Sequence, residues 1–288
     1  MEIKRESLNG NSHPLQNNGE LELFFLGTGS AFATTKFQTN FLIIKGGAHV
    51  LVDFGMSGPM ALAHVAKLKA TDIRCILPTH SHGDHVNGIE CLALMNRYVG
   101  RKFMNHPKIK MIINEEYERI LWDYTLRGAL EYNEEEKATK KRLSLVDYFD
   151  LVRPTWKTHQ PREIFSLWYD GIKIEIFRTK HIPDNADTWE ASFISYGLFI
   201  DDKILISGDT RFDLDLLSHY GDRAEHIIHD VQFFPGGVHA NLPELNTLPH
   251  SLKKNMMLVH YPDDYETHNE EIKDFAGWVE QGVRYLFI

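Results

Sequence analysis

Histidine and aspartate side chains cluster in one short segment of the sequence, residues 79–85, which reads Thr-His-Ser-His-Gly-Asp-His. Imidazole nitrogens and carboxylate oxygens are ligands that zinc, iron and manganese accept in proteins. His80 and His82, two positions apart in an extended turn, can converge on one ion. Asp84 and His85 lie across the turn, where they can bind a second ion. An isolated histidine would more often belong to a solvated loop, but four such groups at this density indicate a metal site.

Further histidines and aspartates stand at the ends of short apolar runs, which are typical of buried strands. The side chains concerned are Asp53, His181, Asp209, His229, Asp230 and His260. Asp53, for example, follows the apolar residues 50–52, and Asp209 follows shortly after residues 204–206. Strand ends at one edge of a sheet hold side chains rigidly enough to keep metal ligands in good geometry. We therefore expect these groups to meet segment 79–85 at one edge of a sheet.

Short apolar runs separated by turn residues predict strands in both halves of the chain, with helices between them. In the first half we expect strands at residues 21–26, 40–44, 50–52 and 73–77, and a helix at residues 60–68. In the second half we expect strands at residues 172–177, 192–200, 203–206, 227–231, 256–259 and 283–288. Strands that recur in both halves favour a layered α/β or α+β sandwich.

Two segments differ in composition from the rest of the chain. Residues 1–20 are rich in Asn, Ser and Gly and contain no apolar block, so we expect a loose N-terminal tail rather than a signal peptide. Residues 21–288 then form the main domain. Within it, residues 98–160 are charged and helical in pattern, which predicts an inserted helical cap. This insert could be a lid over the site, a dimer surface or a peripheral cover of the core.

The overall composition narrows the class of partner. The chain has 288 residues, 43% of them apolar, and a formal net charge of −9. Proteins that bind long nucleic acids usually carry a basic surplus, because neutralising phosphates supplies much of their affinity, so such partners are disfavoured here. No apolar stretch reaches the length of a membrane span, so no membrane partner is expected. The two cysteines, Cys75 and Cys91, fit neither a disulfide framework nor a thiolate metal site, which points to the cytoplasm.

The order of these groups resembles the metallo-β-lactamase superfamily. Its His-x-His-x-Asp-His signature stands here as His80, His82, Asp84 and His85, with Asp53 before it and His181, Asp209 and His260 after it. The resemblance covers residues 21–288 apart from the insert, and it implies an α+β fold, a four-layered αββα sandwich with two metal ions at one sheet edge. One ion would be held by His80, His82 and His181, the other by Asp84, His85 and His260, and Asp209 would bridge both.

The same resemblance carries expectations about the metal and its surroundings. Asp53 would lie behind the ligands and orient one ligand histidine by accepting its other N–H. The cofactor would be two divalent ions; zinc is the metal we expect, although manganese and iron accept the same ligands. A homodimer is also expected from the family likeness and from the insert.

Within the superfamily, the chain is most similar to the ribonuclease Z-like phosphodiesterases. The pair His229-Asp230 stands where that branch has His-Glu, and His239 resembles a histidine that precedes the branch's final ligand. The resemblance assigns catalytic roles to Asp84, His229, Asp230 and His239. In particular, His239 aligned by Asp230 would protonate the leaving group, and His229 would share this role or bind a phosphate oxygen. The His-Asp pair and the lack of a Gly/Pro-rich arm depart from the enzymes that process transfer RNA.

These features predict a dinuclear metal-dependent phosphodiesterase that acts on a small nucleotide, such as a cyclic nucleotide. Aromatic side chains of the insert and its surroundings could stack on the base, and the candidates are Trp122, Tyr124, Trp156 and Trp168. Three alternatives stay open: an endoribonuclease that processes RNA 3′ ends, a hydrolase of lactones or other carbonyl compounds, and a di-iron redox protein. The carbonyl hydrolase would not require Asp230 and His239, and the redox protein would contain iron.

Overall fold

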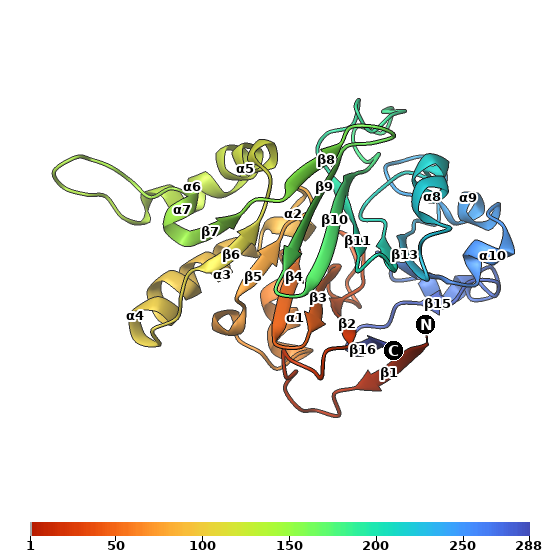
Figure 1. Ribbon diagram of the computed structural model, residues 1–288, viewed down its shortest axis with the longest axis horizontal. Coiled ribbons are helices and arrows are strands. Elements are labelled where there is room, and N and C mark those ends of the chain that lie inside the picture. The colour runs from red at the N-terminus through yellow and green to blue at the C-terminus, as the bar shows by residue number, and fades with distance from the viewer. Residues whose placement is uncertain (1) are drawn as a thin grey trace.

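Two mixed β-sheets pack face to face in the computed structural model, which describes residues 2–288 (Figure 1). In order across it, the first sheet contains β1 (Ile3–Ser7), β16 (Val283–Phe287), β2 (Leu21–Gly27), β3 (Asn40–Lys45), β4 (Ala48–Val52), β5 (Cys75–Leu77), β6 (Ile109–Ile112) and β7 (Phe149–Val152). The second sheet contains β15 (Gly277–Trp278), β14 (Met256–Val259), β13 (His226–Asp230), β12 (Ile204–Ile206), β11 (Tyr196–Ile200), β10 (Ile172–Arg178), β9 (Ile164–Tyr169) and β8 (Thr155–Thr158).

Helices cover the outer faces of both sheets, so the predicted αββα layering is confirmed (Figure 1). The first half of the chain contributes α1 (Gly58–His64), α2 (Gly83–Val86), α3 (Ile89–Met95), α4 (Arg101–Phe103), α5 (Glu115–Leu121), α6 (Arg127–Leu130) and α7 (Leu145–Tyr148). The second half contributes α8 (Leu214–Tyr220), α9 (Leu242–Asn246) and α10 (His250–Lys253). Leu216 of α8 and Leu245 of α9 are buried in one apolar cluster with Leu205 and Leu258 of the second sheet. No helix within residues 2–288 is long and apolar enough to cross a membrane.

Single turns of other helix types complete the structure. Short 3-10 segments lie at Ala70–Asp72, Glu131–Asn133 and Tyr265–His268, and π-helical segments lie at Asn96–Gly100 and Trp122–Leu126.

The strands that precede the candidate metal ligands run in one direction within each sheet. β4 and β5 are parallel, and so are β12, β13 and β14. β10 runs in the same direction as β12, because both are antiparallel to the strand between them, β11. Carboxyl ends of strands with a common direction emerge at one edge of a sheet. The residues that follow these strands are thereby brought to a common edge of the sandwich.

The prediction of a loose N-terminal tail is wrong for residues 3–7, which form β1 and pair with β16 along its whole length. Residue 1 lies outside the described part of the chain. β1 is an edge strand with no fully buried side chain, so its sequence shows no strong apolar pattern. Its backbone hydrogen bonds to β16 hold it in the sheet instead. The following loop is also anchored, because His13 is buried and its Nε2 lies 2.8 Å from Glu22 Oε1.

The predicted helical insert is only partly helical. Its longest helical part is α5, the π-helical segment Trp122–Leu126 and α6. Residues 98–160 also contain β6 and β7, which extend the first sheet, and β8, which is an edge strand of the second. These strands have only four residues each and lie in a charged part of the sequence, so their apolar pattern is too short to reveal them. The segment is therefore built into both sheets rather than inserted as a cap.

Candidate metal centre

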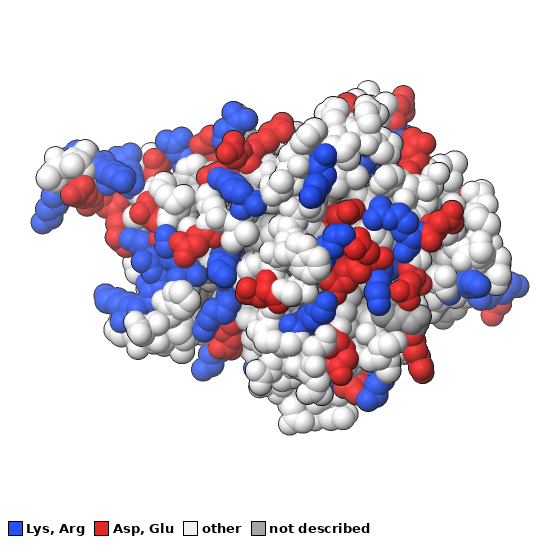
Figure 2. Space-filling model, in the orientation of Figure 1, with Lys and Arg blue, Asp and Glu red and all other residues white. Residues whose placement is uncertain are grey.

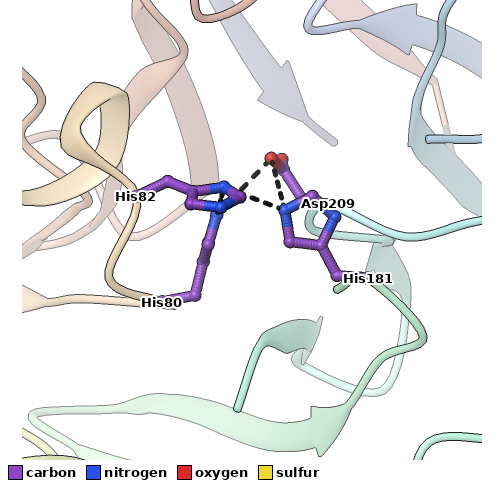
Figure 3. A group of neighbouring side chains, drawn as sticks. All are labelled: His80, His82, His181 and Asp209. Carbon is purple, nitrogen blue, oxygen red and sulfur yellow. Dashed lines mark hydrogen bonds and ion pairs between the residues drawn. The ribbon is translucent and has the colours of Figure 1, made fainter. Parts of the chain in front are cut away.

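Four side chains from three different loops point toward one another at the common strand edge (Figure 3). His80 and His82 lie in the loop after β5, His181 follows β10, and Asp209 follows β12. The Nε2 atoms of His80 and His181 lie 3.1 and 3.0 Å from His82 Nδ1. They lie 3.6 and 3.7 Å from Asp209 Oδ2. Three imidazole nitrogens and one carboxylate oxygen thus surround a space that suits a single metal ion.

A second group of four shares Asp209 with the first. Asp84 and His85 lie on α2, and His260 follows β14. Asp84 Oδ2 lies 3.3 Å from the Nε2 atoms of both His85 and His260. Asp209 Oδ2 lies 3.2 and 3.6 Å from the same two nitrogens. One carboxylate oxygen therefore faces both groups, and the structure brings together all seven predicted ligands in the predicted division.

Backbone features at the strand ends make this convergence possible. Asp53 and His260 adopt left-handed conformations, with φ of 59° and 62°, so the chain turns sharply where each strand ends. Gly55 lies directly against the backbone oxygen of Asp84, where any side chain would clash. This close approach of the loop after β4 holds the signature loop against the sheet edge.

A second layer of hydrogen bonds orients the candidate ligands. Asp53 Oδ2 accepts from His85 Nδ1 at 2.7 Å, which is the contact expected for Asp53. The same carboxylate accepts from the backbone N–H and the hydroxyl of Thr79, both at 2.7 Å. His181 Nδ1 donates to the carbonyl oxygen of Val238 at 3.0 Å. Both histidines consequently present Nε2, the nitrogen that faces Asp209.

The electrostatics of the cluster favour charged carboxylates beside imidazole ligands. Burial by itself raises the pKa of Asp209 and Asp84, but the neighbouring imidazoles outweigh it and hold both pKa values below the usual range. Burial lowers the pKa of His80 and of His181, the latter to about 4, so both are neutral near pH 7 and can bind a metal. Burial also lowers the pKa of His85, but the carboxylates of Asp209, Asp84 and Asp53 raise it overall.

Unpartnered atoms inside the cluster fit a pair of divalent ions. Asp209 Oδ2 and His85 Nε2 are buried and have no hydrogen-bond partner within residues 2–288. Buried polar groups are normally paired, so such atoms call for a ligand. Two groups with three nitrogen or oxygen donors each, joined by one carboxylate, match the donor set of a dinuclear site.

His239 and Asp230 form a hydrogen-bonded pair beside the cluster. His239 Nδ1 donates to Asp230 Oδ2 at 2.9 Å and lies 3.9 Å from Asp209 Oδ2. Burial lowers the pKa of His239, but the hydrogen bond to Asp230 and the charge of Asp209 raise it overall. The structure thus brings these two predicted residues to the site.

His229 lies on the other face of β13 from the metal ligands, with its Nδ1 3.2 Å from Asp230 Oδ1. Successive side chains of a strand point to opposite faces, and the buried His229 pairs in register with Leu258 of the outer apolar cluster. Its Nδ1 donates to the carbonyl oxygen of its neighbour Asp230 at 2.8 Å, and its Nε2 has no hydrogen-bond partner within residues 2–288. The structure therefore does not place His229 among the groups that surround Asp209.

A cavity of about 630 Å³ opens beside His239 and His260. Trp122, Tyr124, Trp156 and Trp168, the four aromatic residues expected to stack on a base, are absent from its walls, and the last three are largely exposed elsewhere. Phe32 and Phe234, which are not among the residues expected from the sequence, line it instead. Both stand among turn residues in the sequence, but only the folded arrangement brings the two rings to one cavity.

Solved structures with the same fold support the resemblance seen in the sequence. A metallo-β-lactamase fold protein from Bacillus subtilis superposes with a TM-score of 0.64 and 15% identity, and the match covers 92% of this chain and 99% of that protein. The human tRNase Z, short form, superposes with a TM-score of 0.57 and 19% identity, covering 90% of this chain and 96% of that protein. The fold is therefore that of the metallo-β-lactamase superfamily, as expected, and the neighbours include the ribonuclease Z-like branch.

Sequence comparison assigns the chain to one family with this fold. The family model described as "Anti-Pycsar protein Apyc1" matches residues 21–285. A relative with that name from Paenibacillus xerothermodurans is 37% identical over 250 residues, covering 85% of this chain and 90% of the relative. The residues matched by the family model include every residue of the candidate metal centre. The chain belongs to the Anti-Pycsar Apyc1 family.

Proposed function

We propose that the protein is a dinuclear metal-dependent phosphodiesterase that hydrolyses a small nucleotide, such as a cyclic nucleotide. The observation that carries this proposal is the shared position of Asp209 Oδ2 between two donor groups, with the His239–Asp230 pair beside it. The family and the fold support the assignment to metal-dependent hydrolases.

The donor groups define which residues would hold the ions. His80, His82, His181 and Asp209 would hold one, and Asp84, His85, His260 and Asp209 would hold the other. Two bound divalent ions would promote ionisation of a water molecule near neutral pH and neutralise charge on the phosphate oxygens. Asp53 and the carbonyl of Val238 fix the orientation of His85 and His181, so that the ligands keep their geometry through turnover.

His239 is the group we assign to protonation of the leaving oxygen. Its Nδ1–H is held by Asp230, which leaves Nε2 to carry the proton that is transferred. Its side chain is 18% exposed and lines the cavity, so a substrate can reach it. We assign His229 to positioning of Asp230, because it is buried and bonded to the backbone of that residue. In this proposal Asp84 acts as a ligand that also orients the attacking water.

The size and charge of the site favour a small substrate. A cavity of about 630 Å³ is within the range of small-molecule pockets and suits a mononucleotide. Basic side chains gather around α4 in Figure 2, while acidic and basic groups mix over most of the rest of that face. The chain as a whole is acidic, with a net charge of −9. This acidic charge balance is unlike that of proteins that bind long nucleic acids, which usually carry a surplus of basic residues.

Hydrolysis of a lactone or another carbonyl compound is the second candidate, because the same donor groups could serve it. The His239–Asp230 pair favours the phosphodiesterase, since a ribose alkoxide leaving group requires a proton in either ring-opening or chain cleavage. RNA 3′-end processing and di-iron redox chemistry are the further alternatives. A substrate panel combined with metal analysis separates them from the phosphodiesterase.

We further propose zinc as the metal, a homodimer as the assembly and the cytoplasm as the compartment. The histidine-rich donor set suits zinc, although manganese and iron are compatible with it. Tyr124 and Val146, which are 84% and 51% exposed, offer apolar contact surface for a second copy. Cys75 and Cys91 are both free cysteines, as a reducing compartment would require. Metal analysis and analytical ultracentrifugation test the first two points, and fractionation of the native host tests the third.

A substrate panel with metal analysis tests the main proposal. Purified protein is assayed with cyclic mononucleotides, linear dinucleotides, precursor transfer RNA, lactones and bis(p-nitrophenyl) phosphate. We expect about two divalent ions per chain and turnover of a cyclic mononucleotide and of bis(p-nitrophenyl) phosphate. Full metal occupancy without phosphodiesterase turnover would reject the proposal, as would a visible iron band combined with redox activity.

A further inference from the structure

The cavity beside His239 and His260 has two exposed aromatic side chains in its walls. Phe32 is 93% exposed and comes from the loop between β2 and β3. Phe234 is 59% exposed and comes from the loop after β13. Burial of a phenylalanine side chain stabilises a fold by roughly 2–3 kcal/mol, so two rings left in water beside a candidate active site indicate a binding surface.

The loop that carries Phe32 is anchored to the segment that carries His260. The Asp263 carboxylate accepts hydrogen bonds from the backbone N–H groups of Thr34 and Thr35 at 2.8 and 2.9 Å, and from both of their hydroxyls at 2.7 Å. Asp263 lies three residues after His260 and also lines the cavity. The position of Phe32 is therefore fixed relative to a candidate metal ligand.

The loop that carries Phe234 is held in a similar way. The side-chain amide of Gln232 donates to the carbonyl oxygens of Phe234 and Gly236. This loop continues to Val238, whose carbonyl accepts from His181, and to His239. Both exposed rings are thus attached to segments that also position groups of the metal centre. A ligand in contact with the rings would have its other end at those groups.

We infer that Phe32 and Phe234 form the subsite for the nucleobase, with the phosphate group of the same substrate at the metal centre. This inference rests on the proposed function and adds the residues that recognise the substrate's base. A base has an apolar face of the size of a phenylalanine ring, and stacking on an aromatic side chain is worth roughly 1–3 kcal/mol. Val231, Val238 and Pro262 add apolar surface that matches the face of a base. The polar groups of Ser30, Gln232, Asp184 and Asp263 in the same walls can meet its polar edge.

Competition with two phosphate esters isolates the contribution of the base. In the metal-loaded enzyme, hydrolysis of bis(p-nitrophenyl) phosphate is inhibited with a nucleoside 5′-monophosphate and, separately, with ribose 5-phosphate. The two inhibitors differ at C1 of the ribose, where ribose 5-phosphate has a hydroxyl in place of the base, so the ratio of their inhibition constants measures the contribution of the base to binding. We expect the nucleotide to bind more tightly to the wild type, and Phe32→Ala and Phe234→Ala each to weaken it about tenfold. Ribose 5-phosphate should bind all variants alike. Phe32→Trp, which keeps an aromatic ring at this position, should bind the nucleotide as tightly as the wild type does.

Trp168→Ala is the matched control, because Trp168 is also an exposed aromatic residue, at 71%, but lines a different cavity. It should leave both inhibition constants unchanged. Equal effects of the phenylalanine variants on both inhibitors, or no effect on either, would overturn the inference. So would a change from dimer to monomer in Phe32→Ala with an unchanged ratio, because Phe32 would then serve an interface. If the enzyme proves inactive, the proposed function fails, but calorimetric titration with the two esters still tests the subsite.

Discussion

Asp230 holds His239 in a single orientation, with His239 Nδ1 2.9 Å from Asp230 Oδ2. The carboxylate is itself fixed, because Oδ2 accepts from the backbone N–H of Thr210 at 3.1 Å. Burial raises the pKa of Asp230, but its hydrogen bonds with His229 and His239 lower it overall, so it stays charged. A charged, immobile acceptor at Nδ1 gives the imidazole the form required of a proton donor at Nε2.

Replacing His239 should therefore slow substrates according to their leaving group. We expect His239→Ala to lower kcat for a cyclic mononucleotide by roughly 10²–10⁴-fold, because the ribose oxygen leaves only with a proton. Hydrolysis of bis(p-nitrophenyl) phosphate should fall far less, since p-nitrophenolate leaves without one. Steady-state kinetics on both substrates, with metal content measured in each preparation, provide the test. Equal losses on both substrates at unchanged metal content would assign His239 to binding rather than to proton transfer.

Asp53→Asn should weaken metal binding without breaking the fold. The backbone of Asp53 is left-handed, a conformation that asparagine also tolerates, so the substitution removes charge while keeping the turn. His85 would lose its charged acceptor at 2.7 Å, and such changes usually lower metal affinity about 10–100-fold. Competition with a chelator, followed by metal analysis, measures the shift. An unchanged affinity would show that Thr79 and the backbone suffice to orient the site.

The metal centre was predictable from the sequence because its ligands follow strong local signals. Asp53 and Asp209 come after short runs of β-branched and apolar residues, and such runs indicate strands in almost any context. The separation of His229 from the metal ligands follows from the same strand pattern. His229 and Asp230 are neighbours in a strand, so their side chains must point to opposite faces, and only one of them can reach the site.

Other features depend on tertiary contacts that no local pattern encodes. β1 is placed by backbone pairing with β16, and β6 by two neighbouring strands, although both segments are short and contain charged residues. Phe32 and Phe234 stand among turn residues in the sequence, but their common position in one cavity follows from where two distant loops meet. Hydrophobic type alone therefore cannot separate a ligand-binding ring from a buried one.

Asp263→Ala should impair substrate binding more than catalysis. The substitution removes the hydrogen bonds that hold Thr34 and Thr35, and with them the loop of Phe32. We expect KM for a cyclic mononucleotide to rise about fivefold, which corresponds to roughly 1 kcal/mol, while kcat changes little. Steady-state kinetics measure both constants, and Asp264→Ala is a neighbouring control outside the cavity lining. A fall in kcat at constant KM would mean that the loop acts on the metal centre instead.

Glu22 should make the stability of the fold depend on acid pH. Its side chain is fully buried; its two oxygens accept from Arg284 at 2.7 and 2.8 Å, and Oε1 also lies 2.8 Å from His13 Nε2. Burial by itself raises the pKa of Glu22, but the hydrogen bonds from Arg284 and His13 outweigh it and lower the pKa to about 2. Because this value lies below that of the unfolded chain, the stabilisation is complete above about pH 4.5. It is lost as the pH falls toward about 2.

Glu22→Gln should accordingly lower the free energy of unfolding at pH 7 by about 3 kcal/mol, because it breaks a buried ion pair. The difference from the wild type should shrink between about pH 4.5 and 2, where the native carboxylate takes up its proton. Urea denaturation of the metal-free proteins at several pH values measures it without interference from metal release. Glu280→Gln is the control, because Glu280 is 57% exposed in its pair with Arg5 and should change stability by less than about 1 kcal/mol. A difference for Glu22→Gln that stays constant across this range would show that packing, and not the charge of Glu22, stabilises this part of the sheet.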